Sequence, residues 1–114
     1  MSPAPLRGEV WTVDLEPVKG HEQGGHRPSL VVSASAFNTG PSGLVVVVPI
    51  TSVRKRSAFH VGVEPPEGGL RRSSFLKPED VRSISADRLG RRLGSVSGQT
   101  VEAVETGLRV LLDL

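Results

Sequence analysis

LVVVVPI, residues 44–50, is the stretch of this chain with the clearest structural preference. Its four consecutive valines are β-branched, which favours an extended backbone, and no helical period runs through them. Pro49 cannot donate a backbone hydrogen bond, so we expect it at a strand end, a sheet edge or a bulge. The run therefore predicts a buried strand that emerges at Thr51 and Ser52.

Shorter segments on both sides of this run also have the pattern of strands. The candidates are residues 9–15, 30–32, 59–63, 74–76 and 81–84, with a basic hairpin over 88–96 and a turn of helix over 34–38. Thirteen glycines and nine prolines indicate many turns between short elements. We therefore expect a mainly β fold of about six short strands closed into a small barrel.

The C-terminal segment has a helical period instead. Ser97 is a suitable N-cap, and the apolar residues after it recur on one helical face, at Val101, Val104, Leu108 and Leu111, with Leu112 beside them. The spacing predicts one amphipathic helix packed on the sheet.

Length and composition limit the kind of protein this is. The chain has 114 residues, enough for one core, and we expect a flexible leader over 1–6 and a single domain over 7–114. The net charge is only +2, but arginines gather between positions 54 and 92, as expected for a surface that meets phosphate groups. Cysteine is absent and no apolar run reaches the roughly 20 residues that cross a bilayer. These features predict a cytoplasmic protein without a membrane partner.

The most polar stretch is GHEQGGHRP, residues 20–28, directly before a predicted strand. A glycine-rich polar loop held by a rigid strand is a common place for binding or catalysis. His21, Glu22 and His26 suggest a metal site, but the sequence offers no fourth ligand, so we expect none. His60, in an alternating segment, is expected to be a surface or core residue.

Several separated motifs, in this order and at this spacing, resemble the MazF/PemK (Kid) toxin family. They are RGEVW (7–11), GHEQGGHRPSLVVS (20–33), VVVVPITS (45–52), EDVRSI (79–84) and DRLG (87–90). The resemblance implies an SH3-like barrel, also found in CcdB, with a C-terminal helix. It further implies a homodimer and a sequence-specific, metal-independent endoribonuclease of a toxin–antitoxin system that needs no cofactor.

The resemblance also assigns roles to residues. Arg27 and Thr51 match the principal catalytic arginine and threonine, and His21, Glu22 and Gln23 match a loop that contacts RNA and contributes to activity in some members. A further RNA-binding segment of the family corresponds here to Lys77, Glu79, Asp80 and Arg82. Its identities differ, with Lys for Arg, Glu for Asp and Asp for Gln, so a catalytic role for Lys77 and Glu79 stays open.

The chemistry expected of such a site is attack by the substrate's own 2′-OH on the neighbouring phosphorus. It yields a 2′,3′-cyclic phosphate and a 5′-OH, and because it requires a 2′-OH, DNA is not cut. The Arg27 guanidinium suits the phosphate oxygens and the Thr51 hydroxyl can donate a further hydrogen bond. His21 and Glu22 are alternative general bases. Arg54, Lys55 and Arg56 form a basic run that either guides RNA or is a solvated surface.

The expected partners are single-stranded RNA and a cognate antitoxin whose disordered C-terminal segment blocks the RNA groove; the toxin alone is not expected to bind DNA. Two alternatives remain. One is a non-catalytic CcdB-like toxin that binds a protein target such as gyrase. The other is a weak relative that acts mainly as an antitoxin-bound regulator.

Overall fold

A curled antiparallel sheet with one C-terminal helix makes up the fold. The computed structural model describes residues 4–15 and 26–114. The strands are β1 (Glu9–Asp14), β2 (His26–Val31), β3 (Leu44–Thr51), β4 (Val61–Val63), β5 (Ser74–Leu76), β6 (Arg82–Ser85) and β7 (Leu89–Ser95). The helices are α1 (Ser35–Asn38) and α2 (Gly98–Leu112), with 3-10 turns at η1 (Glu67–Gly69), η2 (Pro78–Asp80) and η3 (Ala86–Arg88). The expected mainly β barrel with a C-terminal helix is confirmed in the form of a half-barrel.

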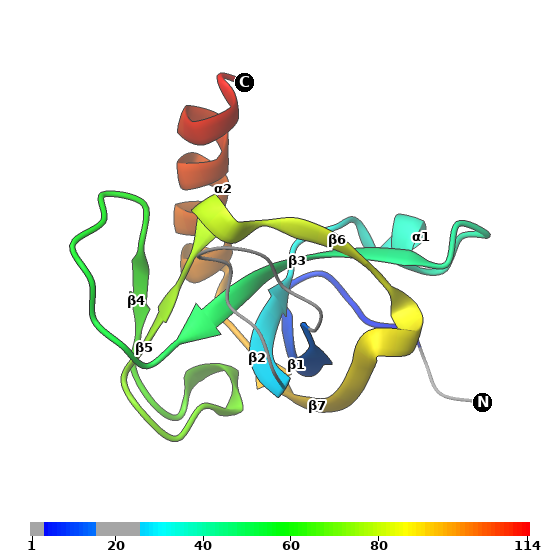
Figure 1. Ribbon diagram of the computed structural model, residues 1–114, viewed down its shortest axis with the longest axis horizontal. Helices are drawn as coiled ribbons and strands as arrows, with labels where there is room; N and C mark the ends of the chain where they lie inside the picture. The colour runs from blue at the N-terminus through cyan, green and yellow to red at the C-terminus, as the bar shows by residue number, and fades with distance from the viewer. Residues whose placement is uncertain (1–3, 16–25) are drawn as a thin grey trace.

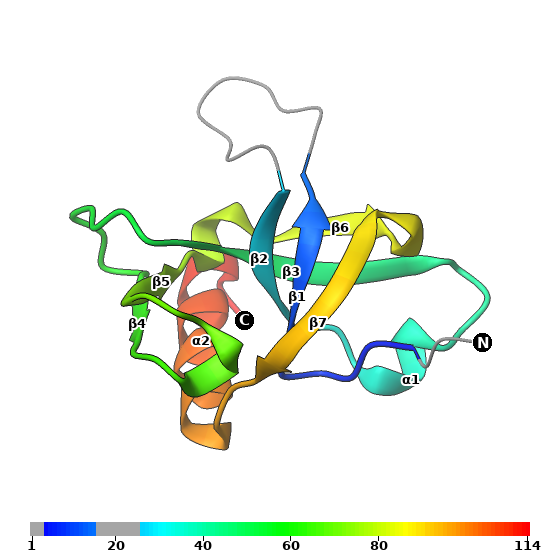
Figure 2. The same ribbon diagram turned by 90° about the horizontal axis from the view of Figure 1, so that it is seen from below.

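The valine-rich strand β3 is the centre of this sheet. The order is β4-β5-β3-β2-β1-β7, and β6 pairs with β3 as well. Strand β3 runs the length of the molecule while β2, β1 and β7 lie across it (Figures 1 and 2). Its first half pairs with β6, from Leu44↔Ser85 to Val47↔Arg82, and its end pairs with β5 at Ile50 and Thr51. One long strand therefore joins both parts of the half-barrel.

Pro49 lies where β3 changes partners rather than at the end of the strand. Its Cα is in register with Ser29 of β2, and its carbonyl accepts a hydrogen bond from the amide of Lys77 at 3.0 Å. On that side of β3 the pairing with β6 ends at Val47, and the pairing with β5 covers only Ile50 and Thr51. Pro49 lies between the two paired stretches, so its missing N–H removes no hydrogen bond of either ladder. A proline is compatible with the central strand for this reason.

Both faces of β3 are buried, which explains the unbroken apolar run. One core cluster contains Val10, Leu30 and Val48, which lie in register across β1, β2 and β3. A second cluster on the other face contains Val31, Val45, Val47 and Ile84. Adjacent side chains of a strand point to opposite faces, so the run supplies both clusters at once.

The predicted hairpin over residues 88–96 is wrong. Residues 89–95 form the single strand β7, paired with β1 through two register shifts. The glycines that suggested a turn are sites of close approach instead. A Cβ on Gly90 would lie 2.4 Å from Thr12 Oγ1, and a Cβ on Gly94 would lie 2.7 Å from the amide nitrogen of Gly69.

Strand β2 is longer than the expected 30–32. It begins at His26, and Arg27 and Pro28 pair with Val13 and Thr12 of β1. The polar and proline residues at its start hid this extension from the sequence pattern.

Only the part of the α2 face up to Leu108 packs against the rest of the domain. Val104 is buried and Val101 and Leu108 are half-buried, as the spacing predicts. Leu111 and Leu112, however, are 36% and 54% exposed, so their predicted packing is wrong. The helix extends past the sheet at its C-terminal end (Figure 1). Among the described residues, no helix has the length and apolar character needed to cross a membrane.

The start of α2 is fixed by Ser97 and by Glu67 of η1. Ser97 caps the helix, with its hydroxyl accepting from the amide of Thr100 at 3.2 Å. Glu67 Oε2 accepts from the Ser97 amide at 2.9 Å and from the Thr100 hydroxyl at 2.5 Å. The Thr100 hydroxyl and the Ser97 amide lower the pKa of Glu67 below its usual value.

Glu67→Gln is therefore expected to lower the free energy of unfolding by about 1 kcal/mol at pH 7. The folded pKa of Glu67 is lowered, so its contribution is complete above the unfolded pKa of about 4.3 and is lost as the pH falls through the folded value. Urea unfolding at pH 7 and below pH 4 measures both effects. Glu102→Gln, on the exposed side of α2, serves as the control. Equal losses at the two pH values would contradict the assignment.

The N-terminal residues that are described are attached to the domain. Pro5 is buried, and its carbonyl accepts a hydrogen bond from Asn38 Nδ2 at 3.0 Å. The amide of Leu6 donates to Glu9 Oε1 at 2.7 Å. The boundary after residue 6 stays a prediction.

Candidate functional site

One pocket of about 330 Å³ opens on the concave side of the sheet, between β2, the end of β3, β7 and the segment that leads into β5. Its polar lining consists of arginines and hydroxyl groups: Arg27, Arg71, Arg72, Arg91, Thr12, Thr51, Ser52 and Ser74. Its apolar lining is Pro28, Ile50, Leu70 and Leu93. No Asp or Glu is among the described residues that line it, so the pocket is suited to an anion.

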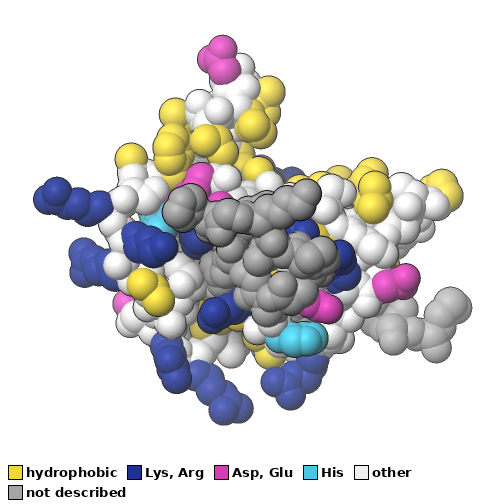
Figure 3. All heavy atoms as spheres, viewed as in Figure 1, with side chains coloured by type: hydrophobic (Ala, Val, Ile, Leu, Met, Phe, Trp, Pro, Cys, Tyr) yellow, Lys and Arg dark blue, Asp and Glu magenta, His cyan; other side chains and the backbone are white. Residues whose placement is uncertain are grey.

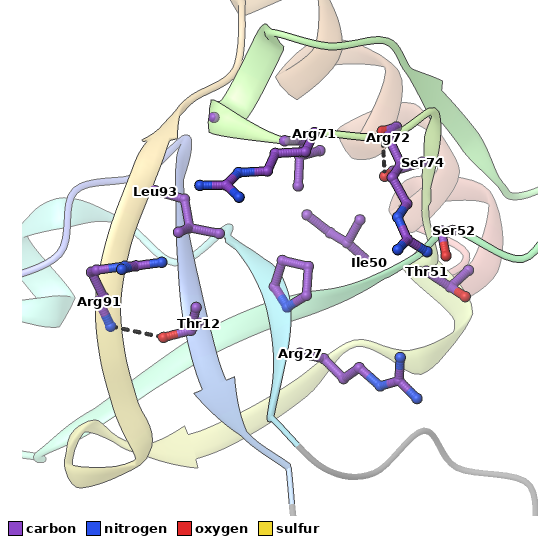
Figure 4. Close-up of a pocket in the computed structure, with 13 residues that line it drawn as sticks. Thr12, Arg27, Ile50, Thr51, Ser52, Arg71, Arg72, Ser74, Arg91 and Leu93 are labelled. Atoms are coloured by element: carbon purple, nitrogen blue, oxygen red, sulfur yellow. Dashed lines mark hydrogen bonds between the residues drawn. The ribbon is translucent and has the colours of Figure 1, made fainter.

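Arg27 and Thr51, far apart in the sequence, both line this pocket (Figure 4). Arg27 is carried by β2, and Thr51 is the last residue of β3. Thr51 Oγ1 accepts a hydrogen bond from the amide of Val53 at 3.1 Å. This turn occupies the hydroxyl oxygen as an acceptor and leaves the hydroxyl proton available to a ligand. Thr51 can therefore stabilise the turn and donate its hydroxyl proton to a ligand at the same time.

Two arginines enter the pocket from the segment between η1 and β5. Arg72 points toward Ser52 and Thr51, whereas Arg71 reaches toward β7 (Figure 4). Their segment is held against β7 by Gly69, which has φ +70°. A Cβ at Gly69 would lie 2.0 Å from the carbonyl oxygen of Leu93, so only glycine allows this approach.

Arg91 is presented to the pocket by an irregularity in β7. Trp11 is paired with Arg92 and Val13 with Leu89, which leaves an additional residue on β7 opposite Thr12. The amide of Arg91 donates to Thr12 Oγ1 at 2.8 Å instead of to the main chain of β1. A bulge of this kind redirects the neighbouring side chains.

Three of the pocket arginines, Arg71, Arg72 and Arg91, differ from the arginines that support the fold. Four other arginines have partners: Arg7 pairs with Glu105, Arg92 donates to Glu9 at 2.6 Å, and Arg82 and Arg88 donate at 3.3 Å to the carbonyls of Leu15 and Asp14. The guanidinium groups of Arg71, Arg72 and Arg91 have no ion pair or hydrogen bond with any described residue. These three charges are therefore available to a ligand.

Glu9 shows how the fold satisfies its own charges. It is buried, and its carboxylate accepts from the Leu6 amide, the Trp11 indole and Arg92. Burial alone would raise the pKa of Glu9, but these hydrogen bonds and the Arg92 charge lower it below its usual value.

The predicted RNA-binding segment at residues 77–82 lies outside the pocket. Lys77 is buried and its Nζ lies 2.7 Å from Asp80 Oδ2, while Glu79 Oε2 lies 2.7 Å from His60 Nε2. Arg82 donates to the carbonyl of Leu15. The His60 side chain is 5% exposed and lies beside the Phe75 ring, so of the two expected positions, surface and core, it occupies a buried one. The role of Lys77, Glu79, Asp80 and Arg82 in RNA binding stays a prediction.

Arg54, Lys55 and Arg56 are exposed in the loop after β3. They do not line the pocket, although the loop begins at two of its residues, Thr51 and Ser52. Lys and Arg side chains project from the left and lower margins of the face in Figure 3, around the segments β4 and β5. Their role as a guide for RNA also stays a prediction.

Comparison with known proteins identifies the family. Residues 6–112 match the model of the PemK-like, MazF-like toxins of type II toxin–antitoxin systems. The chain belongs to this toxin family. It is 36% identical to the endoribonuclease MazF9 of Mycobacterium tuberculosis over 95% of this chain and 96% of that protein.

Solved structures of the PemK/MazF toxin family have the same fold. A crystal structure of MazF from Deinococcus radiodurans is similar with a TM-score of 0.87, 31% identity and coverage of 97% of this chain and 98% of the other. A mycobacterial endoribonuclease, solved in complex with its cognate antitoxin, is similar with a TM-score of 0.81, 31% identity and 97% coverage of both chains. The family predicted from the sequence motifs is therefore confirmed.

The structure does not describe three of the predicted site residues, His21, Glu22 and Gln23. Their contributions stay predictions. Within residues 4–15 and 26–114, no group of three or more His, Asp or Glu side chains is placed to hold a metal ion.

Sequence reasoning missed the second wall of the pocket. Arg71, Arg72 and Arg91 were visible only as part of the arginine-rich region between 54 and 92. The Gly68-Gly69 pair, separated from Arg71 only by Leu70, was the available signal, because two glycines near basic residues permit a close backbone approach.

Proposed function

We propose that this protein is a sequence-specific, metal-independent endoribonuclease toxin that cleaves single-stranded RNA. The observation that carries the proposal is that Arg27 and Thr51 line one pocket with three more arginines and no described acidic residue. Membership of the PemK/MazF toxin family and the endoribonuclease names of relatives such as MazF9 support it.

In this mechanism, the substrate's 2′-OH attacks the adjacent phosphorus and the 5′ oxygen of the next nucleotide leaves. The products are a 2′,3′-cyclic phosphate and a 5′-OH. Arg27 donates to the non-bridging phosphate oxygens and stabilises the charge that accumulates in the transition state. The Thr51 hydroxyl donates to the same phosphate, and Arg72, which points toward Thr51, adds positive charge (Figure 4).

A group near the pocket must remove the 2′-OH proton and another must protonate the leaving oxygen. We assign the first step to His21 or Glu22, the two candidates of the GHEQGGHRP segment. Arg27 is not assigned to proton transfer because a guanidinium retains its proton at neutral pH.

The proposed partners follow from the same chemistry. A basic pocket attracts the acidic residues of an antitoxin as well as RNA, so a disordered antitoxin segment should compete with RNA for it. The complex of a similar mycobacterial endoribonuclease with its cognate antitoxin supports this partner. We further propose that the toxin acts as a homodimer in the cytoplasm.

The proposal is tested by incubating the purified protein with a long mixed-sequence RNA in the presence of EDTA and mapping the new ends. We expect cuts at a defined sequence, with 5′-OH ends and cyclic phosphates, and no cleavage of DNA of the same sequence. Absence of cleavage would contradict the proposal and favour the CcdB-like alternative, in which a protein such as gyrase is the target. Cleavage that occurs without EDTA but is lost when EDTA is added would contradict the metal-independent mechanism.

A further inference from the structure

The pocket has two basic ends, of which the mechanism above uses only one. Arg27, Thr51, Ser52 and Arg72 are at the end near β3, and Arg72 points toward this group (Figure 4). Arg71 reaches in the opposite direction, toward β7, from which Arg91 enters the same pocket. The residues Arg71 and Arg91 are called the β7 end below.

Two local features hold the β7 end in place. Gly69 lies so close to Leu93 that no side chain fits between them, which fixes the segment leading to Arg71. The bulge opposite Thr12 fixes Arg91, whose amide donates to Thr12 Oγ1 at 2.8 Å. The placement of two like charges in one pocket is therefore built into the backbone.

The chemistry of the β7 end fits a phosphate group. Neither guanidinium has an ion pair or a hydrogen bond with a described residue, whereas Arg7 and Arg92, which support the fold, are paired with carboxylates. Unpaired like charges repel each other and lower stability unless an anion lies between them. Guanidinium groups match phosphate oxygens in pairs, and the apolar side chains of Leu70 and Leu93 line the same pocket beside them.

We propose that Arg71 and Arg91 form a second phosphate subsite, which binds an uncut phosphate of the RNA strand while Arg27 and Thr51 hold the phosphate that is cut. The inference rests on the proposed endoribonuclease function. Arg71 and Arg91 act as substrate-positioning residues that bind the strand at a second point, and they fix which bond lies at Arg27.

The test uses an RNA that spans the mapped cut, together with copies in which one phosphate at a time is replaced by an uncharged methylphosphonate. Cleavage rates are measured for the wild type, for Arg71→Gln/Arg91→Gln and for Arg109→Gln. Arg109 is an exposed arginine in the last turn of α2 and does not line the pocket, so it controls for the loss of charge.

For the wild type, methylphosphonate substitution at one position other than the cut phosphate should lower kcat/KM about tenfold, because a charge-assisted contact is lost. The double variant should show the same tenfold loss on normal RNA, mainly as a higher KM, and no additional loss with that methylphosphonate. Its binding to a 2′-O-methyl copy of the RNA should also depend less on salt, with a log–log slope smaller by about 0.7 for one contact. Arg109→Gln should behave as the wild type does.

The subsite would be overturned if the loss from the double variant and the loss from the methylphosphonate multiplied at every position. It would also be overturned if the double variant bound the antitoxin more weakly but cleaved RNA at the wild-type rate. The single variants Arg71→Gln and Arg91→Gln provide the same comparison if the double variant does not fold. If the wild type fails to cut RNA, the proposed function fails. If the wild type cuts and no position is coupled to Arg71 and Arg91, the subsite alone fails.

Discussion

Replacing Arg27 by alanine is expected to lower kcat/KM for RNA cleavage by about 10²–10³-fold, the usual loss for one well-placed donor to a developing negative charge. Arg27 lies on a strand paired with β1 and lines the pocket that also contains Thr51. The Arg27 side chain is exposed and belongs to neither core cluster, so the free energy of unfolding should change little. Single-turnover cleavage of an RNA containing the mapped site measures the chemical step.

Arg27→Lys separates charge from geometry, because lysine keeps the charge but lacks the planar pair of donors. We expect Arg27→Lys to be intermediate and Arg109→Ala, on α2, to retain full activity. The combination of Arg27→Ala with Thr51→Val should cost less than the product of the two separate losses, because both residues bind the same phosphate. Cleavage by Arg27→Ala at the wild-type rate would contradict the assignment of the site.

Replacing Gly69 by alanine is expected to have the largest effect on stability, lowering the free energy of unfolding by about 3 kcal/mol. About 1–2 kcal/mol comes from placing a side chain at positive φ, and the remainder from the overlap of the new Cβ with β7. That Cβ would lie 2.0 Å from the carbonyl oxygen of Leu93, so either β7 or the segment of Arg71 and Arg72 must move. Urea unfolding gives the loss, and KM for RNA reports the displacement of the two arginines.

Gly43 provides a matched control for this substitution. Its φ is also +70°, but a Cβ built there meets no atom within 4 Å. Gly43→Ala therefore introduces the backbone strain of positive φ without a steric clash. It should lower the free energy of unfolding by only about 1–2 kcal/mol. Equal losses for Gly43→Ala and Gly69→Ala would show that the contact with β7 is unimportant.

The elements that sequence patterns predicted well are those in which a single force dominates. The LVVVVPI run is a strand because both of its faces are buried, and α2 packs as its apolar spacing indicates as far as Leu108. Strand β7 was misassigned because its glycines permit close contact with Thr12 and Gly69, which lie far away in the sequence. A local pattern cannot distinguish a glycine that turns the chain from one that makes room for a neighbour.

The same distinction applies to the pocket. Arg27 and Thr51 could be selected through motifs, but their common position depends on the pairing of β2 with β3. Arg91 could not be selected, because exposed arginines are ordinary in a sequence, and for Arg71 the Gly68-Gly69 pair was the available signal; only the tertiary fold brings the two to one cavity. The structure thus supplied the part of the site that depends on long-range contacts.

The arginines that support the fold are different from Arg71, Arg72 and Arg91 of the pocket, so activity and folding can be changed separately. Arg7 and Arg92 pair with carboxylates of the domain, whereas the guanidinium groups of Arg71, Arg72 and Arg91 form no ion pair or hydrogen bond with a described residue. Substitution of these pocket arginines is therefore expected to weaken RNA cleavage without removing a contact that supports the fold. Because the proposed antitoxin segment binds the same basic pocket, such variants should lose affinity for the antitoxin as well as for RNA, so toxicity and its neutralisation decline together.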